Sequence, residues 1–156
     1  MRKMFVWLAI VFLLNVPSVK AGESWIGTVK TVKGTAFLLR NNKILSINIG
    51  EKIFKGDGLR TGPDSSLGMI FKDDTLLSLG SDSEILVKDF LFSPGEGKLS
   101  WVSRLVKGTA ACLTGIIAKL SPQSFRFETP VAQIGIRGTK FAVQVQESGE
   151  SGHENK

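Results

Sequence analysis

The sequence predicts an all-β fold, a single domain in which short antiparallel strands build a sandwich or a jelly-roll-like roll. Between residues 25 and 146, short runs of apolar and β-branched residues alternate with polar ones, as in half-buried strands. Gly, Asn and Asp separate these runs at close spacing, and no long stretch keeps a helical period. Because each such strand is apolar on one face only, a second apolar layer has to cover it.

Turn signals divide the first half of the domain into short strands. We expect strands at residues 26–33, 36–40, 44–49, 59–61, 67–72 and 76–79. Leu45, Ile47 and Ile49 alternate with polar residues, so they are expected to share one face of the third strand. The pair Asp73-Asp74 is expected to turn the chain and to make a hairpin of the last two strands.

The second half contains one ambiguous region. Ile85 and Val87 share a face of an expected strand, and residues 125–128 and 141–146 alternate clearly again. Residues 99–106 and 110–120 are less regular, and the latter also suits a helical turn, which Thr114 and Gly115 disfavour. Residues 31–36 recur in part at 105–110, a repeat that fits either an internal duplication or chance.

The N-terminus has the features of a signal peptide. Arg2 and Lys3 precede an apolar run at residues 5–16, and small residues follow up to Ala21. This run is shorter than the roughly 20 residues that span a bilayer, so cleavage after Ala21 is favoured over a retained anchor. We expect a signal peptide at residues 1–21, a periplasmic or secreted β domain at 22–146 and a disordered polar tail at 147–156. After processing, no integral membrane protein is expected.

Charge and cysteine content argue against two further classes. The chain has 20 Lys and Arg against 14 Asp and Glu, but Arg2, Lys3 and Lys20 belong to the signal segment, so the mature chain keeps 17 against 14. The basic residues are spread singly, so we expect no nucleic-acid partner. Cys112 is alone and cannot form an intrachain disulfide. It is expected to be a buried apolar residue, with a mixed disulfide to a partner as the alternative.

No enzyme site can be assembled from the sequence. The single histidine, His153, lies in the polar tail, so neither a catalytic base nor a histidine metal site is indicated. Glu84, Asp89 and Glu128 could meet as paired carboxylates, but no motif supports this arrangement. We expect no catalytic activity, no metal and no cofactor.

Three aromatic residues leave a choice between packing and recognition. Trp25, Phe90 and Trp101 suit the core or a hairpin, which is their expected place. The alternative is a platform on which sugar rings stack, as in a glycan-binding or scaffolding domain of the cell envelope.

One arginine interrupts the last apolar run of the domain. Residues 129–143 read Thr-Pro-Val-Ala-Gln-Ile-Gly-Ile-Arg-Gly-Thr-Lys-Phe-Ala-Val, so Arg137 stands directly before Gly138 in a strand-forming segment. A guanidinium keeps its proton, so a buried Arg137 needs a carboxylate or carbonyl oxygens, whereas an exposed one offers donors to a partner. Arg137 is therefore predicted to be either a structural clamp or a contact residue.

A second motif, Gly-Asp-Gly-Leu-Arg-Thr-Gly, occupies residues 56–62, and Phe-Lys-Asp-Asp-Thr-Leu-Leu-Ser-Leu follows at 71–79. Together with residues 129–143, these stretches resemble the FecR-like periplasmic domain family over about residues 27–146. Asp74 stands where that family usually has glycine.

The resemblance implies an extracytoplasmic β module that senses or relays a signal by contact with an envelope protein. The cytoplasmic arm with which well-known members control a sigma factor is not expected, because only residues 1–4 precede the apolar segment. The candidate binding residues are Arg137, Gly138 and Thr139, and the expected structural turn motif comprises Gly56, Asp57, Gly58, Thr61 and Gly62. Exposed strand edges would also permit self-association.

Overall fold

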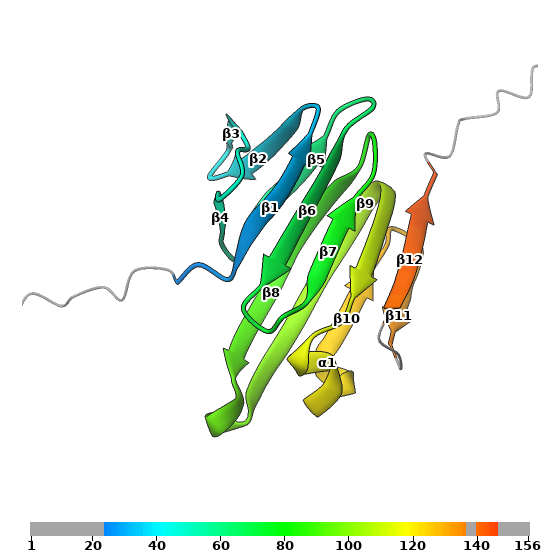
Figure 1. Cartoon of the computed structure of the whole chain (residues 1–156). Helices are drawn as coiled ribbons and strands as arrows, with labels where there is room; N and C mark the ends of the chain where they lie inside the picture. The colour runs from blue at the N-terminus through cyan, green and yellow to red at the C-terminus, as the bar shows by residue number, and fades with distance from the viewer. Residues whose placement is uncertain (1–23, 137–139, 147–156) are drawn as a thin grey trace, which may run out of the picture.

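The computed structural model describes residues 24–136 and 140–146, which form one curled sheet of twelve strands, open on one side like half a barrel (Figure 1). The strands are β1 (Gly27–Lys33), β2 (Ala36–Arg40), β3 (Lys43–Ser46), β4 (Lys52–Ile53), β5 (Gly58–Thr61), β6 (Ser66–Phe71), β7 (Leu76–Leu79), β8 (Glu84–Ser93), β9 (Lys98–Leu113), β10 (Phe125–Glu128), β11 (Gln133–Gly135) and β12 (Lys140–Val145). One short helix, α1 (Ile116–Leu120), and the 3-10 turns η2 (Pro94–Glu96) and η3 (Pro122–Ser124) join them. The prediction of an all-β single domain is confirmed. Within the described ranges, no helix is long and apolar enough to cross a membrane.

The strand order is β3-β2-β5-β8-β9-β7-β6-β1-β4, and all of these pairs are antiparallel. The 16-residue strand β9 belongs to both layers of the curled sheet. Its first part lies between β8 and β10, and its last part lies between β7 and β12. The β9–β10 pair is parallel, which departs from the antiparallel prediction.

The chain passes from one layer to the other at Gly34, between β1 and β2. Gly34 has a φ of +71°, a conformation that L side chains rarely adopt, and an added Cβ would collide with Ser65. The Ser65 hydroxyl accepts a hydrogen bond from the Thr35 N–H at 2.9 Å and donates one to the Pro63 carbonyl at 2.8 Å. Gly34 and Ser65 therefore form a tight corner.

The same corner recurs at Gly108, where β9 changes layers. Gly108 has a φ of +84°, and the Ser83 hydroxyl accepts a hydrogen bond from the Thr109 N–H at 2.8 Å. The Gly80 N–H donates to the Thr109 carbonyl at 2.9 Å, as the Gly62 N–H does to Thr35 at the first corner, at 3.0 Å. The repeated sequence thus builds the same hydrogen-bonded corner twice.

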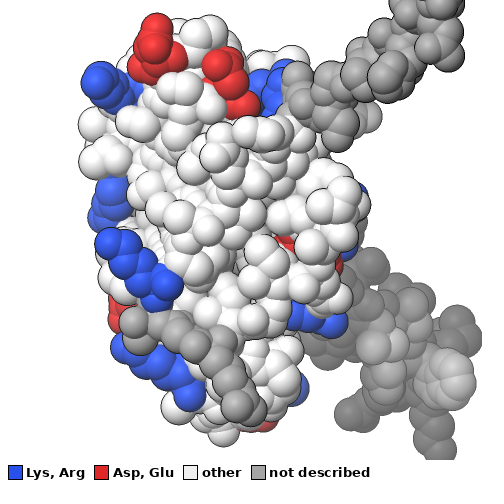
Figure 2. Space-filling model, turned by 90° about the vertical axis from the view of Figure 1, so that its right-hand side faces the viewer, with Lys and Arg blue, Asp and Glu red and all other residues white. Residues whose placement is uncertain are grey.

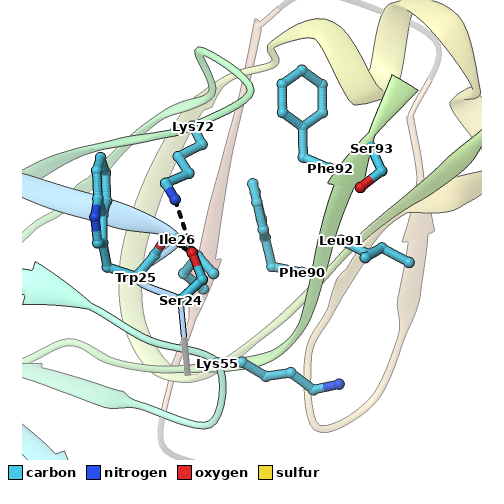
Figure 3. Close-up of a pocket in the computed structure, with 9 residues that line it drawn as sticks. All are labelled: Ser24, Trp25, Ile26, Lys55, Lys72, Phe90, Leu91, Phe92 and Ser93. Atoms are coloured by element: carbon cyan, nitrogen blue, oxygen red, sulfur yellow. Dashed lines mark hydrogen bonds between the residues drawn. The ribbon is translucent and has the colours of Figure 1, made fainter. Parts of the chain in front are cut away.

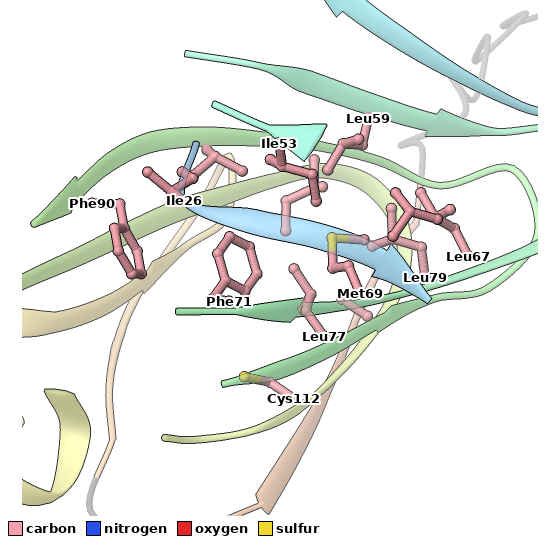
Figure 4. Close-up of a cluster of buried hydrophobic side chains, with 14 of the residues drawn as sticks. Ile26, Ile53, Leu59, Leu67, Met69, Phe71, Leu77, Leu79, Phe90 and Cys112 are labelled. Atoms are coloured by element: carbon pink, nitrogen blue, oxygen red, sulfur yellow. The ribbon is translucent and has the colours of Figure 1, made fainter. Parts of the chain in front are cut away.

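Apolar side chains fill the space between the layers. Trp101 has no exposed surface, and its ring stacks on Phe125 with the centroids 4.3 Å apart. Figure 4 shows the neighbouring part of the core, which includes Ile26, Ile53, Leu59, Leu67, Met69, Phe71, Leu77, Leu79, Phe90 and Cys112. Ile85 and Val87 are both buried whereas Leu86 is exposed, which confirms their predicted common face. Cys112 is a free, buried cysteine, so the prediction of a buried apolar residue is confirmed, and its burial raises the pKa of the thiol to about 12.

The expected strand at residues 44–49 is wrong in its second half. β3 ends at Ser46, and only Ile47 is buried, whereas Leu45 and Ile49 are 46% and 68% exposed. The reason is local. β3 is an edge strand that pairs only with β2 among the described strands, and the chain then turns at Gly50, which has a φ of +90°.

The ambiguous region contains both a strand and a helix. β9 continues to Leu113, and α1 begins at Ile116. Gly115 separates the two, and its N–H donates to the Thr75 hydroxyl at 3.0 Å. A Cβ on this glycine would collide with the backbone of the turn at Asp73. Close packing on that turn therefore fixes where the strand ends and the helix starts.

Candidate functional site

The carboxylate of Asp57 fastens the turn motif at residues 56–62 to β2. Asp57 is 1% exposed and accepts two hydrogen bonds from Arg40, Nε to Oδ1 at 2.8 Å and Nη2 to Oδ2 at 2.7 Å. The backbone N–H of Phe54 also donates to Oδ2, at 2.7 Å, and the Arg40 guanidinium lies 4.5 Å from the centre of the Phe54 ring. Sequence reasoning missed Arg40, because no spacing rule joins a turn residue to a strand residue 17 positions away.

Two other members of the predicted turn motif, Gly58 and Thr61, occupy close-packed positions, whereas Gly56 has open space around it. Gly56 has a φ of +87°, and Gly58 lies in β5 directly opposite Leu39, whose Cβ would be 3.2 Å from an added methyl group. Thr61 is buried, and its hydroxyl donates to the Gly80 carbonyl at 2.6 Å and accepts from the Ser83 N–H at 2.9 Å. These contacts all lie within the fold.

The Asp73-Asp74 turn carries a buried carboxylate. Asp73 has no exposed surface and accepts hydrogen bonds from the Thr75 N–H at 3.2 Å and from the Thr75 hydroxyl at 2.8 Å. Asp74 has a φ of +64°, which Asp tolerates better than most residues and which explains glycine at this place in the family. Burial raises the pKa of Asp73, although the hydrogen bonds from Thr75 oppose this shift.

The raised pKa predicts a pH-dependent effect of Asp73→Asn. The native state holds a proton at Asp73 more tightly than the unfolded chain does, so the wild type loses this stabilisation as the pH rises above about 4. Urea unfolding between pH 4 and pH 8 is expected to show a gap between wild type and variant that is largest at low pH. A gap that stays constant, or that widens with pH, would contradict this assignment.

The candidate binding residues Arg137, Gly138 and Thr139 lie outside the described residues. In the chain they connect β11 to β12. β12 pairs along one side with β9, from Lys140 opposite Leu113 to Val145 opposite Gly108, and with no other described strand. Its second side therefore presents backbone N–H and C=O groups that no described strand pairs.

β12 lacks the features that commonly protect a sheet edge. Lys140 is its single charged residue, and it contains no proline. Phe141, Val143 and Val145 are half-buried against the core, whereas Ala142 is exposed. The other edge strands among the described residues are shorter, since β3 has four residues, β11 three and β4 two. Figure 2 shows the side of the molecule on which β12 lies, and the middle of this surface carries no charged side chain.

The three acidic residues considered for glycoside chemistry each bind a different cation. Glu84 pairs with Arg60 at 2.8 Å, Asp89 with Lys55 at 2.6 Å and Glu128 with Lys88 at 2.8 Å. The hydrogen bond from Lys55 holds the pKa of Asp89 below its usual range. No group of three potential metal ligands occurs in the part of the chain that the structure describes.

The aromatic residues considered for sugar stacking differ in how far their side chains are buried. Trp101 is fully buried and Phe90 is 8% exposed, so their expected place in the core is confirmed. Trp25 is 39% exposed, and Lys52 and Lys72 cover its ring. The three rings therefore do not form one sugar-stacking platform, and that alternative is wrong.

The family model described as FecR protein matches residues 57–153, well over half of the 156-residue chain. The match begins at Asp57 and extends through β12, so it includes the first motif from its second residue onward and all of residues 129–143. Comparison with curated proteins and with solved structures gave no match. The chain therefore belongs to the FecR family, a family of regulatory and signalling proteins.

Proposed function

We propose that this protein is an exported FecR-type module that relays a signal by binding a partner protein of the cell envelope along the free edge of β12. The observation that carries the proposal is this edge itself, which is six residues long, unprotected and inside the region that matches the family. An extended segment of the partner would add to the sheet, with main-chain hydrogen bonds giving affinity.

Specificity would come from the side chains around this edge. Phe141, Val143 and Val145 offer an apolar row that a neighbouring strand would extend. Arg137, Gly138 and Thr139 precede β12 in the chain, and we propose them as contact residues, with Arg137 donating to a carboxylate or to carbonyl groups of the partner. The relay is thus a binding step in which no covalent bond changes.

The proposal places the working domain outside the cytoplasm. Residues 1–21 would act as a signal peptide, and the β domain at 22–146 would work in the periplasm or after secretion. The absence of cysteines other than Cys112 suits a domain that folds there without disulfides.

Photo-crosslinking in living cells tests the proposal. A photoreactive residue in place of the exposed Ala142 on β12 is expected to give one dominant adduct with an envelope protein. The matched control is Ile44, which is 66% exposed on the edge strand β3 and should give no such adduct. An adduct of twice the mass of the chain would instead identify β12 as a self-association edge.

A further inference from the structure

A separate cavity of about 360 Å³ lies where the chain enters β1, away from β12 (Figure 3). Trp25 and Lys72 form one wall, and Phe90 and Phe92 form the facing wall. Phe90 reaches this cavity from the core, where it stacks on Phe71 with the centroids 5.9 Å apart. The cavity therefore combines an apolar floor, anchored in the core, with a mouth open to solvent.

Two ammonium groups converge on the indole of Trp25. Lys72 Nζ lies 4.0 Å from the ring centre and donates to the Ser24 hydroxyl at 3.0 Å. Lys52 Nζ lies 4.1 Å from the same ring and donates to the Thr28 hydroxyl at 3.2 Å. Neither lysine takes part in an ion pair with a described carboxylate. The hydroxyls and the ring hold both charges in place and leave them unneutralised by the described residues.

The charge pattern selects the kind of ligand. An aromatic cavity often receives a cation, but the ammonium groups of Lys52 and Lys72 already lie against the ring and would repel one. The other lysine that lines the cavity, Lys55, is neutralised by Asp89, and none of the residues that line the cavity is acidic. An anion at the mouth would therefore meet the ammonium group of Lys72, which no described carboxylate neutralises, and no opposing charge.

We propose that this cavity binds an organic anion, a carboxylate or phosphate attached to a flat ring or a short hydrocarbon body. The anionic group would take hydrogen bonds from Lys72, which covers the ring of Trp25, and the apolar body would lie against the rings of Phe90 and Phe92. The cavity volume falls in the range of small-molecule sites. The site does not depend on the edge of β12, so failure of either proposal leaves the other standing.

Binding of 2-naphthoate to the processed protein tests the site. ¹⁵N NMR titration is expected to shift the indole N–H of Trp25 and the amides of residues 90–93, whereas neutral 2-naphthalenemethanol should bind far more weakly. Lys72→Gln is expected to weaken naphthoate binding about tenfold, the loss of one charge-assisted hydrogen bond. Lys43→Gln, an exposed lysine on β3, is the matched control and should leave affinity unchanged.

A second arm distinguishes a free organic acid from a lipid headgroup. Sedimentation with phosphatidylcholine vesicles, with and without phosphatidylglycerol, is measured for the wild type and for Lys72→Gln. Binding of naphthoate that depends on Lys72 supports the site and identifies a free organic acid as its ligand. Binding of the anionic vesicles that depends on Lys72 supports the site and identifies a lipid headgroup. Equal affinity for naphthoate and its neutral analogue, equal loss in Lys43→Gln, or no binding to either probe would overturn it.

Discussion

Arg40→Ala is expected to lower the free energy of unfolding by about 3 kcal/mol, because it leaves the buried carboxylate of Asp57 without its charged partner. The pair is bidentate, and the same guanidinium also donates to the Lys52 carbonyl at 2.8 Å and covers the Phe54 ring. The variant therefore loosens β2, β4 and the turn before β5 together. Arg40 is 26% exposed at its side chain, which places the effect at the lower end for a broken buried pair.

The control for Arg40 is a surface ion pair of similar length. Lys88→Ala removes the partner of Glu128 at 2.8 Å, but the lysine side chain is 40% exposed, so a loss of less than about 1 kcal/mol is expected. Chemical denaturation of both variants compares them directly. Equal, small losses for Arg40→Ala and Lys88→Ala would contradict a structural role for the Asp57 motif.

Gly108→Ala is expected to destabilise the fold by about 3 kcal/mol or more, because the corner of β9 leaves no room for a side chain. Its φ of +84° costs an alanine about 1–2 kcal/mol. The new Cβ would also lie 2.5 Å from the Cα of Ser83 and 2.7 Å from its Cβ, an overlap that adds about 1–3 kcal/mol. β9 pairs with β7, β8, β10 and β12, so a shift there reaches both layers.

Gly50→Ala separates the cost of the positive φ from the cost of the steric overlap. Gly50 has a similar φ of +90°, but an added Cβ meets no atom within 4 Å, so only the conformational cost of about 1–2 kcal/mol should appear. Thermal and urea unfolding of both variants measure the difference. If Gly108→Ala were no more destabilising than Gly50→Ala, the close contact with Ser83 would not contribute to the loss of stability.

The sequence predicted those strands whose alternation reflects burial on one face. Ile85 and Val87 illustrate this, as does the hairpin around Asp73-Asp74, since period-two patterns and turn residues are local signals. The strand at residues 44–49 failed because an edge strand needs no buried face, so its apolar residues carry no information about where pairing ends. The length of β9 was also hidden, because the parts of this strand before and after Gly108 belong to different layers of the sheet.

Contacts between distant segments could not be read from the sequence. The partner of Asp57 is Arg40 on another strand, and Trp25 meets Lys52 and Lys72 only after β1, β4 and β6 have paired. The repeated corner is an intermediate case. Its Gly-Thr pair was visible at both positions, but Ser65 and Ser83, which complete it, became evident only from the hydrogen bonds.

Crosslinking from Ala142 compared with Ile44 in living cells is the most direct measurement of the central claim that this module acts by strand contact along β12. Strand contact along β12 predicts a single envelope protein joined to position 142, with the adduct lost when an excess of unlabelled wild-type protein competes for the partner. An adduct with the same protein from position 44, with none from position 142, would contradict it.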